Sequence, residues 1–123
     1  MKLTKNFRLS EFACKDGTPV PSELMQNVIE LAEQLQVLRD FIGKPIRVNS
    51  AYRTPSHNKK VGGSPLSQHL QAKAADIKVD GIRPSEVHGI IKELIKDGRM
   101  QEGGLGRYVS FTHYDIRNYK ARW

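Results

Sequence analysis

The chain has 123 residues, which predicts one domain spanning 1–123 with a hydrophobic core of its own. Its 38% hydrophobic and 27% charged residues are typical of a globular protein. One cysteine, Cys14, excludes an intramolecular disulfide, and no apolar run reaches the ~20 residues of a membrane span. Because residues 1–12 lack the apolar segment of a secretory signal, we expect synthesis in the cytoplasm.

The formal net charge is +7, from 20 basic and 13 acidic residues. The surplus lies in two segments: 39–60, with six basic and one acidic residue, and 99–123, with five and two. Such a surface favours nucleic acid, an anionic membrane or an anionic cell wall as partner, and a merely solvated surface is the simpler alternative. No zinc-finger spacing and no basic helix with interleaved aromatic residues occurs, so charge alone does not choose the partner.

The first long element is a helix of about 18–20 residues that follows Ser22, which we predict as its N-cap. Gly43 ends this helix and Pro45 prevents its continuation. Apolar residues recur at spacings of three and four and form one buried stripe: Val28, Leu31, Leu35, Leu38 and Ile42.

A strand is predicted over 46–49, followed by a long loop over 50–66 that is rich in Ser, Pro, Gly and Asn. Loops of this length in compact domains are usually functional or disordered. Alternation resumes over 74–79, where Ala75, Ile77 and Val79 share one face of a second strand.

The remaining pattern predicts a helix from Pro84 to Gly98, a flexible glycine-rich turn over 103–106, and strands over 107–110 and 111–117. The fold class is therefore α+β, with helices packed on a small, mostly antiparallel sheet.

Three polar residues are candidates for chemistry: His69 at the end of the long loop, Asp76 in the second strand, and His113 in the last strand. Two imidazoles and a carboxylate are a ligand set for catalytic zinc, with a fourth position left for water. Singly, each residue has a simpler interpretation as a surface histidine, a capping carboxylate or a half-buried histidine. Of the other histidines, His57 is a candidate substrate contact, and His88 faces solvent and receives no role.

Two segments resemble a known family. Ser67-x-His69-x6-Asp76 resembles the SxHxxGxAxD motif of the zinc D-Ala-D-Ala carboxypeptidases and L-alanyl-D-glutamate endopeptidases, which share the Hedgehog/DD-peptidase fold. Phe111-x-His113-x-Asp115-x-Arg117 resembles the second metal segment of that family. The resemblance spans nearly the whole chain. Further matches are Asn49-Ser-Ala-Tyr-Arg53 and Val61-Gly-Gly63, while Phe7-x-Leu-Ser-Glu-Phe12 and Arg122-Trp123 look like the ends of a short, phage- and bacteria-associated branch.

The resemblance implies that one zinc ion is bound by His69, Asp76 and His113. It also implies that Arg53 stabilises the oxyanion of the tetrahedral intermediate, where the alternative is a salt bridge that anchors the loop. Ser67 would orient the site by hydrogen bonding, or is an ordinary turn serine.

The chain departs from the family pattern at two points. Ala72 stands where the motif has glycine, which demands a permissive backbone angle. The general base is the second departure, because Ser110 and Phe111 occupy the positions where relatives place an acid or a histidine. Asp115 could act as the base or could hydrogen-bond a ligand histidine, and Glu102 is another candidate base.

The sequence therefore predicts a monomeric zinc metallopeptidase that cleaves peptidoglycan stem peptides by attack of metal-activated water. We expect neither nucleic-acid binding nor membrane insertion, and action on the cell wall after lysis or non-classical delivery, as with endolysins. The alternatives are a non-catalytic wall-binding module that keeps the fold and metal, and a nucleic-acid binder suggested by charge alone.

Overall fold

In the computed structural model, which describes residues 1–123, the longest helix is α1 (Met25–Ile42). It follows the predicted stripe, of which Val28, Leu31, Leu35 and Leu38 are buried. Gly43 ends the helix in the left-handed conformation, at φ 72°. The predicted N-cap is wrong: Ser22 lies in a separate 3-10 turn, Ser22–Leu24, and α1 begins without a side-chain cap.

One five-stranded sheet forms the centre of the fold, in the order β1-β2-β4-β3-β5. Neighbouring strands are antiparallel except for β3 and β5, which are parallel, so the predicted α+β class with a mostly antiparallel sheet is confirmed. The strands are β1 (Ile46–Ser50), β2 (Ala74–Val79), β3 (Gly104–Arg107), β4 (Thr112–Asp115) and β5 (Ala121–Arg122).

The register of the sheet aligns three polar residues and a glycine in one row across four strands. Asp76 of β2 lies opposite Ser50 of β1 on one side and opposite His113 of β4 on the other. His113 in turn lies opposite Gly106 of β3. Because paired residues in antiparallel strands point to the same face, this row places Asp76 and His113 side by side.

The glycine-rich segment is a strand and not the predicted flexible turn. β3 runs over Gly104–Arg107, and the strand predicted over 107–110 is absent. A Cβ atom on Gly104 would meet the carboxylate of Asp115, and one on Gly106 would meet the indole of Trp123. The glycines therefore allow other side chains to pack closely against β3. The prediction of a flexible turn failed because it took glycine only as a turn signal.

The predicted loop over 50–66 contains a short helix, α2 (Pro55–Lys60). Its N-cap is Thr54, whose hydroxyl accepts a hydrogen bond from the backbone N–H of His57, and Pro55 occupies the first turn. A 3-10 turn, η3 (Gln68–Gln71), follows and leads into β2.

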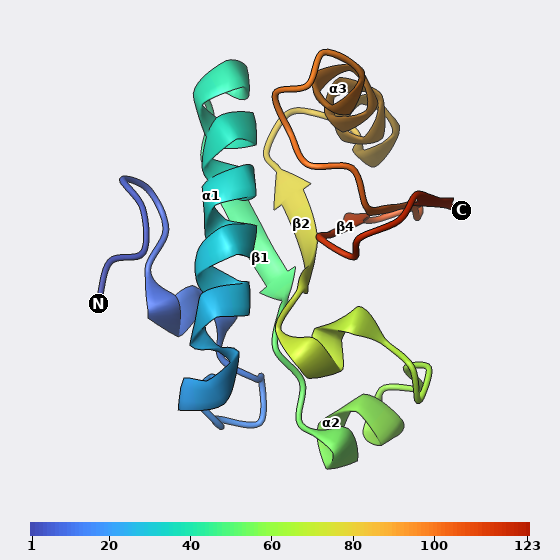
Figure 1. Ribbon diagram of the computed structural model, residues 1–123. Helices are drawn as coiled ribbons and strands as arrows, with labels where there is room; N and C mark the ends of the chain where they lie inside the picture. Colours follow the sequence, from blue (N-terminus) through green and yellow to red (C-terminus); the bar gives the residue numbers. More distant parts are fainter.

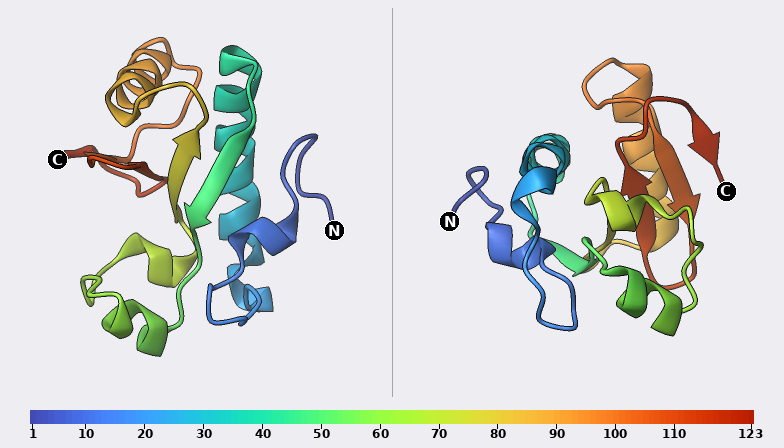
Figure 2. Two further views of the ribbon diagram at one scale, coloured as in Figure 1. Left: turned by 180° about the vertical axis from the view of Figure 1, so that it is seen from behind. Right: turned by 60° about the horizontal axis from the view of Figure 1, so that its bottom comes forward.

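The helices surround the sheet on several sides (Figures 1 and 2). α1 runs alongside β1 (Figure 1), and the N-terminal 3-10 turn η1 (Leu9–Phe12) contacts β1 as well. α3 (Pro84–Lys96) buries Val87, Ile91 and Leu94 and contacts β2, β3 and β4. α2 and η3 lie at the opposite end of β2 from α3. None of the helices is both long enough and apolar enough to cross a membrane.

Candidate metal centre

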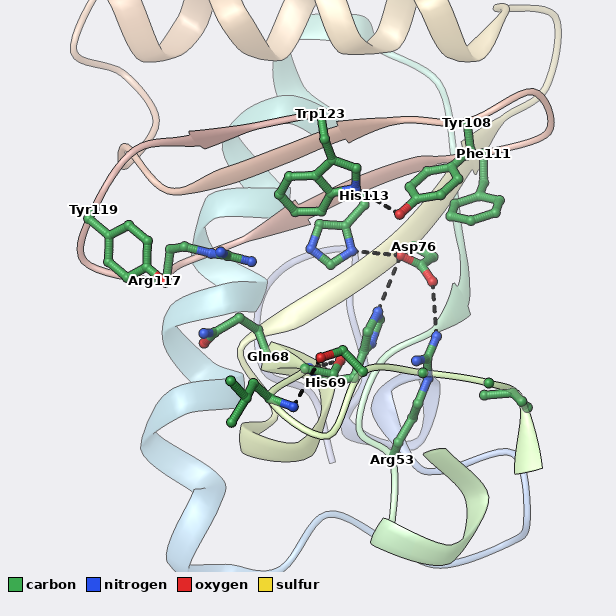
Figure 3. Close-up of a pocket in the computed structure, with 16 residues that line it drawn as sticks. Arg53, Gln68, His69, Asp76, Tyr108, Phe111, His113, Arg117, Tyr119 and Trp123 are labelled. Carbon is green, nitrogen blue, oxygen red and sulfur yellow. Dashed lines mark hydrogen bonds and ion pairs between the residues drawn. The ribbon is translucent and has the colours of Figure 1, made fainter. Parts of the chain in front are cut away.

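Three side chains from separate elements converge at one point, which we call the central site (Figure 3). They are His69 of η3, Asp76 of β2 and His113 of β4, and one ligand atom of each lies within 4.8 Å of the others. Asp76 Oδ1 lies 2.9 Å from His113 Nδ1 and 3.3 Å from His69 Nε2. All three residues are buried.

Local backbone structure aims the His69 ring at this point. Ser67 caps η3 and its hydroxyl accepts the backbone N–H of His69 at 3.1 Å. Ala72 ends η3 in the left-handed conformation, at φ 57°, so the permissive angle predicted there is confirmed. The Nδ1–H of His69 donates to the carbonyl oxygen of Ala51 at 2.7 Å, which leaves the Nε2 lone pair facing Asp76.

Asp115 holds the ring of His113 from behind. Its Oδ2 accepts the Nε2–H of His113 at 2.7 Å. The same carboxylate is fully buried and also accepts the backbone N–H of Gly104 at 2.9 Å and two guanidinium N–H groups of Arg117 at 2.8 Å each. These bonds fix the His113 tautomer whose Nδ1 lone pair faces Asp76.

The donor set fits a divalent cation. The outer nitrogens of His69 and His113 donate to acceptors, so their inner nitrogens carry lone pairs, as does the oxygen of Asp76 between them. Three lone pairs that face one another repel unless a proton or a cation lies among them. Two imidazoles and one carboxylate match the ligands of zinc sites that leave a fourth position open.

Electrostatics in the metal-free protein agree with this geometry. Burial alone would raise the pKa of the Asp76 carboxyl, but hydrogen bonds from His113 and His69 hold that pKa well below its usual range. Burial alone would lower the pKa of His113, but hydrogen bonds with Asp115 and Asp76 raise it above its ordinary value. Without a metal, these hydrogen bonds therefore favour the charged forms of both Asp76 and His113.

Arg53 lies directly beside the central site. Its Nη2 is 3.3 Å from Oδ2 of Asp76, the oxygen that faces away from the histidines. Its Nη1 donates to Asn58 Oδ1 at 3.2 Å and its Nε donates to Ser50 Oγ at 3.1 Å. The side chain is 14% exposed, so the guanidinium is fixed in place and still reaches solvent.

The central site opens into a cavity of about 570 Å³. Aromatic rings form one wall: Trp123 lies with its ring centroid 4.9 Å from that of His113 and donates from Nε1 to the hydroxyl of Tyr108 at 2.7 Å. The guanidinium of Arg117 lies 5.2 Å from the centre of the Trp123 ring. The residues that line the cavity are Arg53, Val61, Gly62, Gly63, Ser64, Leu66, Ser67, Gln68, His69, Asp76, Tyr108, Phe111, His113, Arg117, Tyr119 and Trp123.

Three residues singled out from the sequence lie outside this cavity lining. His57 sits on α2, where its neighbours include Cys14 and Asp16. Asp115 lies behind His113, and Glu102 pairs with Arg122 at 2.7 Å. Asp76 is thus the single carboxylate among the lining residues. 

The aromatic wall contains side chains to which sequence reasoning gave no role. Tyr108 and Tyr119 belong to no motif of the sequence, and Trp123 was noted only because the end of the chain, Arg122-Trp123, resembles that of the short branch of the family. Their proximity arises because β5 pairs with β3 and brings the end of the chain over His113.

Comparison with known proteins agrees with this site. The family model described as peptidase M15 matches residues 5–115, which covers most of the chain. The chain therefore belongs to the peptidase M15 family, whose members are zinc-dependent metallopeptidases. No curated protein matches the sequence at a significant level.

Proposed function

We propose that the protein is a zinc peptidase that cleaves peptidoglycan stem peptides, of the D-Ala-D-Ala carboxypeptidase or L-alanyl-D-glutamate endopeptidase type. The observation that carries this proposal is the convergence of three lone pairs beside a fixed arginine in an open cavity. Family membership supports a metallopeptidase, and the two motif segments support the substrate class.

In this proposal His69, Asp76 and His113 hold one zinc ion. Zinc supplies Lewis acidity, which activates a water molecule and polarises the scissile carbonyl. Ser67 and Ala51 orient His69, while Asp115 orients His113 and keeps its outer nitrogen protonated. Asp115 therefore acts through His113 and does not itself reach the substrate.

Arg53 is the residue that we propose to stabilise negative charge on the carbonyl oxygen. Its guanidinium lies next to Asp76 and lines the cavity, and hydrogen bonds to Asn58 and Ser50 hold it in place. A cation that is fixed before the reaction needs no reorganisation when charge develops, which is the basis of oxyanion stabilisation.

The charge of the cavity suits an acidic peptide. Arg53 and Arg117 lie on opposite sides of the central site, and Figure 3 shows both facing the space between them. They belong to the two basic segments of the chain, 39–60 and 99–123. Stem peptides carry free carboxylates that these guanidinium groups can bind, so we propose a stem peptide and not nucleic acid as partner.

Mass analysis of fragments released from purified peptidoglycan tests the proposal and identifies the bond that is cut. We expect release of D-alanine or of whole stem peptides by the wild type and no release by His69→Ala, which should also hold about one zinc ion fewer per chain than the wild type. Purified wild type that holds no stoichiometric zinc and releases no fragment overturns the proposal.

A second function is favoured by one observation, the shortage of proton acceptors. Asp76 is the single carboxylate that lines the cavity, and the carboxylates of Asp115 and Glu102 are engaged elsewhere. A wall-binding module that keeps the zinc but lacks a general base would have this arrangement. Zinc in the protein together with binding to peptidoglycan but no cleavage would select this function over catalysis.

A further inference from the structure

A second group of metal ligands lies outside the cavity, between the N-terminal loop and α2. It consists of Cys14, Asp16 and His57, and one ligand atom of each lies within 4.8 Å of the others. None of the three lines the cavity of the central site. Cys14 is buried, His57 is half-buried and Asp16 is exposed, so the group opens to solvent on the Asp16 side.

Thr54 holds the two sides of this group together. Its hydroxyl donates to Asp16 Oδ2 at 2.9 Å and lies 3.9 Å from the sulfur of Cys14. On the α2 side, the same oxygen accepts the backbone N–H of His57 at 3.2 Å.

A tight turn presents Cys14 and Asp16 toward α2. The backbone N–H of Cys14 donates to Thr18 O at 2.8 Å, and Asp16 Oδ1 accepts the backbone N–H of Thr18 at 2.9 Å. The carboxylate of Asp16 and the backbone of Cys14 and His57 are therefore held before any ion binds, which lowers the entropic cost of binding.

The chemistry of this donor set selects the metal. Thiolate and imidazole are ligands of zinc, whereas calcium and magnesium take oxygen ligands. In a tetrahedral zinc site neighbouring donor atoms lie about 3.3–3.8 Å apart, so a contraction of about 1 Å would bring this group to zinc geometry. Three protein ligands leave the fourth position to solvent on the exposed side.

We propose that Cys14, Asp16 and His57 form a second zinc site, which cross-links the N-terminal loop to α2. The site explains why the one cysteine of the chain, which has no disulfide partner, lies buried beside an imidazole and a carboxylate. α2 also carries Asn58, which is bonded to Arg53, so an ion here stabilises the segment that supports Arg53.

Titration of the metal-free protein with Co²⁺ tests this site, with a phosphine reductant present to keep Cys14 reduced. The central site contains no sulfur, so thiolate-to-cobalt charge-transfer absorption in the near ultraviolet reports the second site alone and does not depend on peptidase activity. We expect this absorption in the wild type and its retention in His113→Ala. We also expect its loss in Cys14→Ser.

Zinc stoichiometry provides the second measurement. We expect about two zinc ions per wild-type chain and about one in Cys14→Ser and in His57→Gln. His57→Gln changes a half-buried surface position and keeps the proposal testable if Cys14→Ser does not fold, which far-UV circular dichroism checks. Wild type that binds Co²⁺ without thiolate absorption, or a zinc stoichiometry that is the same in wild type and His57→Gln, overturns the proposal.

Discussion

Hydrogen bonds to Asp76, Asn58 and Ser50 fix the guanidinium of Arg53 beside the central site. Lysine at this position keeps the charge but loses the planar set of donors that makes these bonds. We therefore predict that Arg53→Lys lowers kcat/KM on peptidoglycan fragments by about 10²–10³-fold, the usual effect of losing an oxyanion donor. Zinc content should not change, because Arg53 is not a ligand in our proposal. Activity close to that of the wild type would contradict the role proposed for Arg53.

The Asp115 carboxylate orients His113 and is fully buried. Asparagine has no charge and only one acceptor oxygen, so it cannot accept the His113 N–H together with both N–H groups of Arg117. We therefore predict that Asp115→Asn weakens zinc binding at the central site by about 10–100-fold. Competition with a fluorescent chelator measures this change. Asp80→Asn is the matched control, since Asp80 is an exposed carboxylate that pairs with Arg47 and belongs to neither group of candidate ligands, and the zinc affinity of this variant should equal that of the wild type.

At the scale of single residues, the sequence was sufficient to select His69, Asp76 and His113 as candidate metal ligands, because the ability to bind a metal ion depends on the type of residue. The sequence left open whether Asp115 faces the substrate as a general base or faces a ligand histidine as its hydrogen-bond partner. Its orientation is decided by the Gly104 N–H and by Arg117, which reach Asp115 through pairing of β3 with β4 and a local turn. Strand register is a tertiary property, which explains why residue spacing could not settle this orientation.

At the scale of elements, the junction between η3 and β2 is strained at Ala72, which adopts φ 57°. A non-glycine residue in this conformation costs roughly 1–2 kcal/mol. Glycine avoids this cost, but its greater conformational freedom in the unfolded state offsets part of the gain in stability. We predict that Ala72→Gly raises the free energy of unfolding by about 0.5–1 kcal/mol, measured by urea denaturation. Ala74→Gly, in extended backbone two residues later, should lower it by about 0.5–1 kcal/mol. Equal signs for the two variants would refute this explanation.

The elements with strong apolar periodicity were predictable, and those shaped by tertiary contacts were not. α1 and α3 follow patterns that match one buried face, and the apolar face predicted for β2 is buried, although Ala74 and Asp76 on its other face are buried too. α2 has only six residues, which is too short for a periodic signal, and β3 is glycine-rich because Asp115 and Trp123 fill the space of its missing side chains. β3 pairs with the strand that carries His113, and α2 carries Asn58, which bonds to Arg53.

At the scale of the whole molecule, the stability of the metal-free protein should depend on pH in two directions. The pKa values of Asp76 and Asp115 are held well below the ordinary 3.8, so their stabilisation is present above that value and is lost as the pH falls below it. The pKa of His113 is raised above its ordinary 6.5, so its stabilisation is present below pH 6.5 and is lost as the pH rises through the raised value.

We therefore predict that the melting temperature of chelator-treated protein falls when the pH rises from 6 to 8. Zinc should reverse this trend, because it takes the place of the protons among the ligands and binds more tightly as they leave. Thermal unfolding with and without excess zinc at each pH measures both effects. His113→Ala is the control, and its metal-free melting temperature should lose the decline above neutral pH. A rise in the wild type without metal would contradict the raised pKa.

The direct pairing of Asp76 with His113 joins two residues 37 positions apart in the chain. During refolding, these ligands can meet only after β2 and β4 have paired in the native register, since a slip of one residue turns a ligand to the opposite face. Capture of zinc by all three ligands of the central site therefore reports that β2 and β4 have paired in the native register. A metal-sensitive dye in a stopped-flow experiment would time the formation of this long-range contact within the folding reaction.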